Sequence, residues 1–521
     1  MERKWWTLVA VCTGVFMLLL DITIVNVALP AIEKAFRASL SDLQWVIDAY
    51  ALTLAALLLT AGSIADLRGR RIVFAVGIVI FTLGSILCGL AQSATMLSIS
   101  RGFQGIGGAI MFSTALALLA QAFPPRERGV AFAIFGAVTG VSVAVGPVLG
   151  GVLTSGLSWR WIFFVNVPIG IFALLVTLRE VEESKLPGAR RPDLPGVVTF
   201  SLALAGLVYG LIRSQPDGWG SLHVVVPLAV AVLLMGAFLV IELRSPEPML
   251  DLRLLRVPTF NGGLIAAFGI SASIFSLLTY LTIFIQNILG YSAVQAGIRF
   301  LPFTGVTFFA AAGAGRLSDR VPTRYLISGG FVLLTIGMLL MRGLTPTENW
   351  THFLPGFIVA GIGAGMINPP LASTAVGVVA PERAGMASGI NSTFRQVGIA
   401  TGVAGLGSIL ASVVTSQVSS RLAHTPLAAH GHQLAVAVAG GSLPQAAAAV
   451  PTKLQGVLFG AARAGYVDAL NSVLLIGAIV AGVAVVATLV LIRQKDFHDP
   501  GAAPAPEPGP ADGEPVAVAS V

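Results

Sequence analysis

The feature that most constrains this chain is a succession of long apolar runs. An α-helix needs about 20 residues to cross a hydrocarbon core of ~30 Å, and we count fourteen runs of that length. Only 11% of the 521 residues are charged and the mean hydropathy is +0.88, whereas soluble proteins carry about 25% charged residues. The chain is therefore predicted to be an all-α integral membrane protein.

The runs fall into three groups. We expect an N-terminal six-helix bundle at residues 1–180, an inserted helix pair at 190–245 and a C-terminal six-helix bundle at 255–495. A long outer loop is expected at about 416–467 and a disordered, Pro- and Ala-rich cytoplasmic tail at 496–521. The predicted helices are 5–30, 44–65, 72–92, 96–120, 129–155, 161–178, 195–213, 223–241, 259–287, 296–316, 324–342, 352–379, 385–415 and 468–492.

The distribution of Lys and Arg predicts the orientation in the membrane. With both termini in the cytoplasm, twenty of the 31 basic residues fall in inner segments. Inner segments are enriched in Lys and Arg, so this topology is favoured over its inverse, and the expected location is the cytoplasmic membrane. Eight basic residues fall in outer segments (Lys34, Arg37, Arg160, Arg213, Arg342, Arg421, Lys453 and Arg463), and three lie within helices (Arg101, Arg299 and Arg395).

The two bundles repeat each other in sequence. Gly62–Asp66 recurs as Gly315–Asp319, in both cases near the inner end of an even-numbered helix of its half. Gly105–Gly107 likewise recurs as Gly361–Gly363, and Pro125 with Gly129 recurs as Pro381 with Gly385. Parallel repeats of six helices are a design of alternating-access transporters. The sequence therefore indicates a transporter.

Other classes of protein are disfavoured by the same composition. The net charge of +7 follows from the membrane topology, so no nucleic-acid partner is expected. Cys12 and Cys88 both lie in apolar runs and suggest neither a disulfide nor a metal cluster. His424, His430 and His432 of the outer loop could bind a metal, but no Cys or carboxylate accompanies them, and a solvated loop is the favoured interpretation.

Two carboxylates inside predicted helices are the strongest functional candidates. Among the 24 acidic residues only Asp21 and Asp48 lie well inside the membrane, and Arg101 lies in the same outer half of the first bundle. Ionisable groups in a bilayer are costly and usually functional. Burial and a nearby arginine act in opposite directions on the proton affinity of a carboxyl group, so a small movement or bound cargo can change its protonation. We therefore predict a proton-coupling site formed by Asp21, Asp48 and Arg101.

A purely structural role is the alternative for these residues. Asp48 and Arg101 would then form a buried pair between two helices, and Asp21 would be hydrogen-bonded by Thr or Asn side chains. Gln104 lies one turn from Arg101 and either lines the substrate cavity or bridges helices by a hydrogen bond. In the second bundle, Asn391 and Arg395 lie four residues apart near mid-membrane, where they contact cargo or Arg395 serves as a counter-ion between the bundles.

Small residues within helices and a cluster of charges at one turn suggest that the helices move relative to one another. Gly136 with Gly140, and Gly146 with Gly150, repeat every four residues and favour close helix approach, and Pro147 should bend its helix. At the inner turn after the second helix, Asp66 lies beside three arginines and could latch one conformation. The alternative for this cluster is the ordinary inner bias of positive charge. The arginines are Arg68, Arg70 and Arg71.

Five motifs carry a family resemblance that extends over nearly the whole chain. Leu20–Pro30 resembles the first-helix signature of the fourteen-helix drug:proton antiporters (EmrB/QacA type) of the major facilitator superfamily. Gly62–Arg71 is similar to the family's loop motif between helices two and three, and Arg101–Gly108 to its fourth-helix motif. Gly146–Gly151 is similar to the antiporter motif of helix five, and Trp159–Pro168 to the sixth helix.

The resemblance implies the major facilitator fold and proton-driven efflux of small lipophilic substrates by a monomer, with no cofactor other than the proton gradient. It makes Asp21 and Asp48 proton or cation sites and Arg101 their coupling partner. The implied latch comprises Gly62, Asp66, Gly69, Arg70 and Arg71, and the implied antiporter motif comprises Gly146, Pro147, Gly150 and Gly151.

Two departures from the family pattern bear on cargo. Ser142 stands where the antiporter motif usually has glycine, which a small residue should tolerate. The second bundle has no deep carboxylate, whereas family members that favour dications carry an extra acid there. We therefore expect lipophilic monocationic or neutral drugs as cargo.

Three competing functions are distinguishable. A dedicated exporter of one endogenous metabolite, such as an antibiotic, shares the fold and differs only in cargo range. A membrane-embedded enzyme needs a nucleophile with a base, or a metal site, and the sequence offers no His within a helix interior. A sensor would be expected to carry a folded soluble output domain, which the short tail does not provide.

Overall fold

The computed structural model describes residues 2–38, 40–184, 193–246, 248–318, 320–380, 383–440 and 443–497, which form helices and connecting segments without a strand. Thirteen of the described helical spans are long and apolar enough to cross a membrane, and α5 (Pro125–Gly156), with 32 residues, is a further long helix of the bundle. The predicted all-α membrane fold with about fourteen helices is confirmed. The tail from residue 498 onward, Asp319 and Pro381 lie outside the described residues.

The first bundle begins with long helices joined by short turns. Ser93 illustrates how the sequence starts them: its hydroxyl accepts a hydrogen bond of 3.2 Å from the backbone N–H of Met96 and so caps the following helix. The helices besides α5 are α1 (Arg3–Phe36), α2 (Leu40–Arg68), α3 (Arg70–Gly89), α4 (Ala94–Ala122), α6 (Trp161–Phe164) and α7 (Asn166–Glu180).

The sixth span is broken where one continuous helix was predicted over 161–178. It consists of α6 and α7, separated at Val165. Pro168 has no N–H and cannot bond the carbonyl group of Phe164 one turn earlier, which weakens the helix at this point. The break places Asn166 at the first turn of α7, inside the bundle.

The inserted pair, α8 (Leu194–Asp217) and α9 (Leu222–Arg244), packs as a hairpin beside α2 and α15. Thr60 of α2 and Ser201 of α8 share a hydrogen bond of 3.0 Å. Most of α9 is exposed, and Val232 and Leu233, both 73% exposed, are typical of its outward face. Such a surface is stable only against lipid, which agrees with a membrane-embedded position.

The second bundle continues from a short 3₁₀ turn, η1 (Leu252–Arg256). Its first membrane span is a composite in which two π-helical turns, η2 (Ser271–Phe275) and η3 (Phe284–Ile288), interrupt the α-helix. The α-helices are α10 (Pro258–Ile270), α11 (Ser276–Ile283), α12 (Ala293–Leu317), α13 (Thr323–Leu340), α14 (Leu354–Gly377), α15 (Ala384–Leu422) and α18 (Thr452–Leu491), with 3₁₀ turns η4 (Trp350–Phe353) and η7 (Gln494–Asp496).

The outer loop predicted at 416–467 is wrong in both length and character. α15 continues to Leu422 and α18 starts at Thr452, and the connection between them carries η6 (Ala428–His430), α16 (Gly431–Ala439) and α17 (Leu443–Ala448). The helices continue beyond the apolar runs because their buried faces, with Val418, Leu422 and Leu458, join the core of the second bundle. This segment is thus folded.

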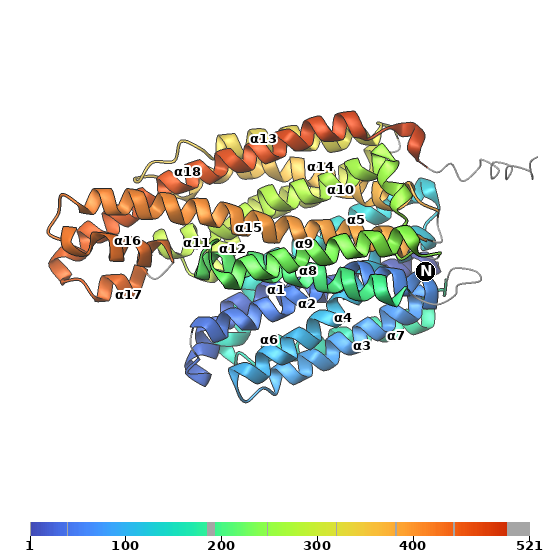
Figure 1. The fold of residues 1–521 in the computed structure, drawn as a ribbon, viewed down its shortest axis with the longest axis horizontal. Helices are drawn as coiled ribbons and strands as arrows, with labels where there is room; N and C mark the ends of the chain where they lie inside the picture. The colour runs from blue at the N-terminus through green and yellow to red at the C-terminus, as the bar shows by residue number, and fades with distance from the viewer. Residues whose placement is uncertain are drawn as a thin grey trace, which may run out of the picture.

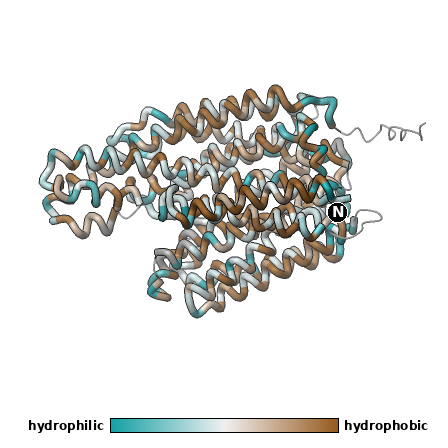
Figure 2. Tube along the Cα trace, viewed as in Figure 1, coloured by the Kyte–Doolittle hydropathy of each residue, from teal (hydrophilic) through white to brown (hydrophobic). Residues whose placement is uncertain are grey.

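The helical connection projects from one end of the molecule. Figure 1 shows α16 and α17 at the opposite end of the bundle from the N-terminus. In Figure 2 the brown, apolar residues fill the middle of the bundle, whereas teal and white predominate at the projecting part. Following the predicted topology, we call the end with the N-terminus the inner end and the end with α16 and α17 the outer end.

The two bundles meet mainly along α2 and α5 of the first bundle. α2 packs against α15, and α5 packs against α12 and α14. Near the inner end the approach is so close that a Cβ atom on Gly315 of α12 would lie 2.6 Å from both the Cβ of Ala133 and the backbone oxygen of Gly129 in α5. Gly62 of α2 is in similar contact with the backbone of Gly385 in α15. The molecule is therefore closed at its inner end.

Candidate proton-coupling site

Asp21 is the centre of a buried cluster contributed by four helices, which we call the Asp21 cluster. The carboxylate pairs with the guanidinium of Arg101 and accepts hydrogen bonds from Gln104 Nε2 at 2.9 Å and Asn166 Nδ2 at 3.0 Å. The hydroxyl of Ser85 accepts from both amides, at 2.7 and 3.2 Å. Asp21 is 1% exposed and Arg101 2% exposed. Hydrogen bonds and an ion pair thus satisfy both oxygens of a carboxylate that lies deep in a membrane protein.

Arg101 is enclosed on every side by the first bundle. Its Nε donates to the backbone carbonyl of Val46 at 3.2 Å, and its guanidinium lies 4.1 Å from the ring centroid of Tyr50. Gly105 permits this arrangement, because a Cβ there would lie 2.7 Å from the carbonyl oxygen of Tyr50. Arg101 therefore spans α1, α2 and α4, and a change in the charge of Asp21 would act on all three helices.

Gln104 lies within this cluster, where it is fully buried and bonded to both Asp21 and Ser85. Of the two roles open for Gln104 in the sequence, the structure shows the helix-bridging hydrogen bond, not the lining of an open cavity. A Cβ on Gly84 of α3 would lie 2.7 Å from Gln104 Cα, so α3 and α4 approach closely beside this side chain.

Asp48 stands apart from the Asp21 cluster. Arg101 is paired with Asp21, and within the described part of the chain it forms no ion pair with Asp48. Asp48 is half-buried on α2, and the charge that acts on it comes from Arg213 of the inserted helix α8. The structure therefore differs from the alternative in which Asp48 and Arg101 hold two helices together, and it separates the two deep carboxylates.

This separation predicts different phenotypes for the two carboxylates. Asp48→Asn should lower ethidium-driven proton movement in reconstituted vesicles by only a few-fold, because the Asp21–Arg101 pair stays intact and Asp48 is partly exposed. The measurement is the initial rate of proton movement at saturating ethidium. Complete loss of proton movement in Asp48→Asn, with normal protein stability, would show that Asp48 is as essential as Asp21.

Asp66 connects the two bundles at the inner end. It accepts hydrogen bonds from the backbone N–H groups of Gly385 at 2.9 Å and Met386 at 2.8 Å, which begin α15. Arg70 donates to the same carboxylate from Nε at 2.9 Å and Nη2 at 2.8 Å. An anion at a helix N-terminus is favoured by the free N–H groups and the helix dipole. A first-bundle carboxylate thus caps a second-bundle helix and joins the two bundles at the inner end.

Glu183 organises the neighbouring turn and was not anticipated from sequence. Its carboxylate accepts from the backbone N–H groups of Arg71 at 3.0 Å and Ile72 at 3.2 Å, at the start of α3. Gly69 has φ +114°, and a Cβ there would lie 2.7 Å from the Glu183 carboxyl carbon. The positive φ favours glycine at this position, and the Glu183 carboxylate lies where a side chain would be. The guanidinium of Arg71 is 3.9 Å from Glu183, so Arg71 faces the turn and not Asp66.

The antiporter-motif glycines of α5 face two different partners. A Cβ on Gly146 would collide with Thr23 of α1, and one on Gly150 would lie 2.9 Å from Ile24 Cγ1. Gly151 instead faces the second bundle, where a Cβ would lie 2.6 Å from Val294 Cγ2 of α12. Pro147 lies within α5. The motif therefore brings α5 against the helix that carries Asp21 and against the opposite bundle.

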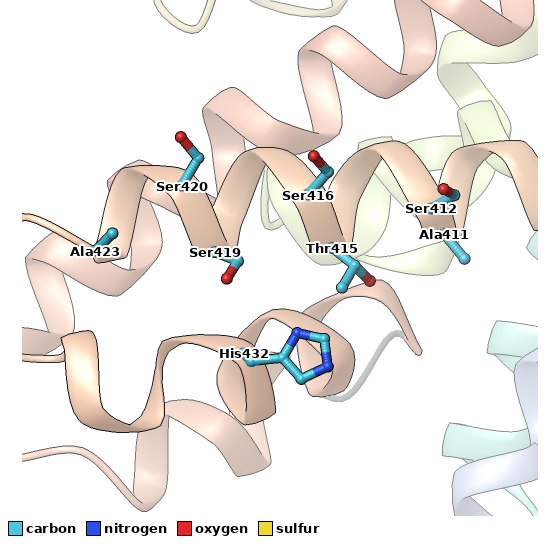
Figure 3. Close-up of a pocket in the computed structure, with 8 residues that line it drawn as sticks. All are labelled: Ala411, Ser412, Thr415, Ser416, Ser419, Ser420, Ala423 and His432. Atoms are coloured by element: carbon cyan, nitrogen blue, oxygen red, sulfur yellow. The ribbon is translucent and has the colours of Figure 1, made fainter.

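A groove of about 590 Å³ lies at the outer end between α15 and α16. In Figure 3, Thr415 and Ser419 point toward the helix that carries His432. No residue of the first bundle lines the groove, so it is separate from the Asp21 cluster. Across the described residues, no three His, Cys, Asp or Glu side chains gather to hold a metal. The lining residues are Ala411, Ser412, Thr415, Ser416, Ser419, Ser420, Ala423 and His432.

Comparison with known proteins gives this architecture a family. The sequence profile of the Major Facilitator Superfamily matches residues 11–403. The chain belongs to the Major Facilitator Superfamily. The predicted family is confirmed, and with it the assignment of the chain to a superfamily of transporters.

Relatives within the superfamily are drug and antibiotic exporters. The chain is 38% identical to the multidrug resistance protein Stp of Mycobacterium tuberculosis over 80% of this chain and 78% of that protein. It is 33% identical to the tetracenomycin C resistance and export protein of Streptomyces glaucescens over 98% and 95% of the two chains. The crystal structure of the human organic anion transporter MFSD10 (TETRAN) shares the fold, with a TM-score of 0.55 at 14% identity over 92% of this chain and 100% of that one.

Several residues that contact Asp21 and Asp66 in this transporter were not anticipated from the sequence. Asn166 and Ser85 were not proposed, although Asn166 is a polar residue inside the predicted sixth helix and could have been weighed with Asp21. Gly385 and Met386 bind Asp66 through backbone N–H groups, which no side-chain pattern reveals.

Proposed function

We propose that this protein is a proton-driven antiporter that exports lipophilic drugs across the cytoplasmic membrane and works as a monomer with both termini in the cytoplasm. The observation that carries the proposal is the Asp21 cluster, a buried carboxylate whose charge holds Arg101. Protonation of Asp21 removes that charge, and a buried arginine without its partner costs several kcal/mol. The free-energy change caused by binding one proton is therefore large enough to change how α1 packs against α4.

The closed inner end determines the side from which a proton can arrive and to which cargo can leave. While Asp66 caps α15, the bundles are joined at the inner end, so a proton arrives from the outer side and cargo leaves there. Release of Arg101 by protonated Asp21 then favours the alternative packing in which the inner end opens. This order couples inward proton movement to outward drug movement without any cofactor or covalent chemistry, and it requires no enzymatic activity.

The names of the relatives support drug cargo. Stp is a multidrug resistance protein, and the tetracenomycin C protein confers resistance and export. The lack of a deep carboxylate in the second bundle led us to expect lipophilic monocationic or neutral drugs from the sequence, so dyes of that kind are the first cargo to test.

Reconstitution tests the proposal directly. The purified full chain in liposomes with an internal pH reporter should move protons upon addition of ethidium or rhodamine dyes, whereas protein-free liposomes should not. Proton movement with several dissimilar dyes supports multidrug antiport. The absence of proton movement with every transported dye would overturn proton coupling.

A dedicated exporter of one antibiotic is the second candidate. It is favoured by relatives named for single compounds, such as the cephamycin export protein of Amycolatopsis lactamdurans, 36% identical over 85% of this chain and 93% of that protein. A narrow cargo range in the same vesicles, with proton movement for one structural class of compound and none for the others, would support this candidate.

A further inference from the structure

Three polar residues of α15 form one face of that helix, which we call the α15 donor face. Ser388, Asn391 and Arg395 are spaced three and four residues apart, so they lie on the same side. Arg395 is eleven residues from the start of α15 at Ala384, a depth of about 16 Å at 1.5 Å per residue. That depth is close to the middle of a hydrocarbon core of ~30 Å.

The hydrogen-bonding capacity of this face is mostly unused. Asn391 Nδ2 and Ser388 Oγ are buried and have no hydrogen-bond partner, and Asn391 is only 2% exposed. Arg395 donates from Nη2 to Asn368 Oδ1 of α14 at 3.0 Å. No carboxylate among the described residues pairs with Arg395. A guanidinium has five N–H donors, so most of those of Arg395 are available.

The deep carboxylates are engaged elsewhere. Asp21 is paired with Arg101, Asp66 is bound to Arg70 and the start of α15, and Asp48 lies on α2 toward Arg213 of α8. Arg395 is therefore a positive charge near mid-membrane without a counter-ion in the described part of the protein. Such a charge is costly in a bilayer and indicates a function that supplies a partner.

The side of α5 near Asn368, the hydrogen-bond partner of Arg395, carries two glycines that are not tightly packed. Asn368 is partly exposed, and it faces Gly136 of α5, where a Cβ would lie 3.7 Å from Asn368 Cβ. One turn further along α5, a Cβ on Gly140 would have nothing within 4 Å. The expectation that Gly136 and Gly140 mark a tight helix contact is therefore wrong at Gly140. The glycines instead leave the first-bundle wall opposite Asn368 without side chains.

We propose that Arg395, which donates to Asn368, binds an acidic group of the cargo together with Asn391, and that this group is one such as a phenolate or a carboxylate. Ser388 Oγ, Asn391 Nδ2 and the remaining N–H groups of Arg395 can all donate a hydrogen bond, so an acceptor complements this face. A guanidinium pairs best with an anionic oxygen group. The inference rests on the proposed function and names its substrate class: lipophilic acids are preferred to lipophilic cations. It replaces the monocationic cargo expected from the sequence.

Equilibrium binding separates the two kinds of cargo. Fluorescein is an acid and rhodamine 123 a monocation on the same ring skeleton, and fluorescence anisotropy gives the Kd of each for the purified full chain. Wild type should bind fluorescein more tightly. Arg395→Gln should weaken fluorescein binding at least about tenfold, as expected for loss of a hydrogen bond to a charged group, and change rhodamine binding less than about twofold. Arg395→Lys should restore part of the fluorescein affinity.

A matched control uses another arginine within a helix. Arg299 of α12 lies 3.5 Å from the ring centroid of Tyr291, away from the α15 donor face, and Arg299→Gln should leave both Kd values unchanged. Equal weakening of both dyes by Arg395→Gln, or tighter binding of rhodamine 123 by wild type, would overturn the acidic cargo.

Proton movement in vesicles distinguishes this inference from the function on which it rests. Proton movement with fluorescein that is lost in Arg395→Gln supports both. Proton movement with rhodamine 123 alone would leave antiport standing and overturn the acidic cargo. Arg395-dependent fluorescein binding without proton movement for either dye would support the acidic site and overturn proton coupling.

Discussion

Asp21→Asn is expected to reduce drug-driven proton movement to the level of protein-free vesicles. The asparagine keeps the shape of the side chain. It has no carboxyl group to bind a proton and no negative charge to neutralise Arg101. Removing one member of a buried ion pair costs about 3–5 kcal/mol, so the variant should also be less stable. The measurement is the rate of proton movement upon addition of dye, together with the thermal unfolding temperature of the purified protein.

A double variant separates coupling from stability. In Asp21→Asn with Arg101→Gln, no unpaired charge remains in the cluster, so the unfolding temperature should return toward that of wild type while proton movement stays absent. Proton movement in the stable double variant at the wild-type rate would exclude Asp21 as the coupling residue.

Gly62→Val is expected to keep the inner end open. A Cβ at Gly62 would collide with the carbonyl oxygen of Gly385 and lie 3.3 Å from Gly389 Cα, and backbone atoms cannot move aside as a flexible side chain can. Leu59 of α2 is fully buried and touches Gly389 in the closed form. Labelling of Leu59→Cys by a water-soluble maleimide from the inner side should therefore become at least about tenfold faster when Gly62→Val is added.

The chain provides a matched control for this substitution. Gly313 of α12 has nothing within 4 Å of a Cβ position, so Gly313→Val should leave the labelling rate unchanged. The native Cys12 and Cys88 are replaced in all of these variants. An unchanged labelling rate in Gly62→Val, with normal expression and unfolding temperature, would mean that the halves close without this contact.

Hydropathy predicted the membrane helices well because bilayer thickness dictates their length. Position inside an apolar run identified Asp21 as a residue of interest, and the charged turn after the second helix identified Asp66. The sequence contains less information on how these residues pair. It could not predict that Arg101 pairs with Asp21 and not with Asp48. Three residues of one bundle at similar depth satisfy both pairings, and only the helix rotations decide between them. The cap that Asp66 places on α15 was equally hidden, since backbone N–H groups carry no sequence signature.

The errors at the outer end have a different cause. Apolar runs mark where a helix is in lipid, and they do not mark where the helix ends. α15 and α18 therefore extend past the predicted boundaries at 415 and 468, and contacts between them include the 2.9 Å ion pair of Arg421 with Asp468. Such a pair joins residues 47 positions apart, which local patterns do not reveal.

Because α15 and α18 are long, a small rotation of the second bundle produces a large displacement at their outer ends. α15 has 39 residues and α18 has 40, which at 1.5 Å per residue is about 60 Å, twice the thickness of the hydrocarbon core. A rotation of the second bundle by about 10° around the inner contact would swing the tip of a rod of that length by about 10 Å. The tip formed by α16 and α17 should therefore turn the proposed opening and closing of the bundles into a displacement that a single pair of spectroscopic labels can follow, far from the residues proposed to bind a proton or cargo.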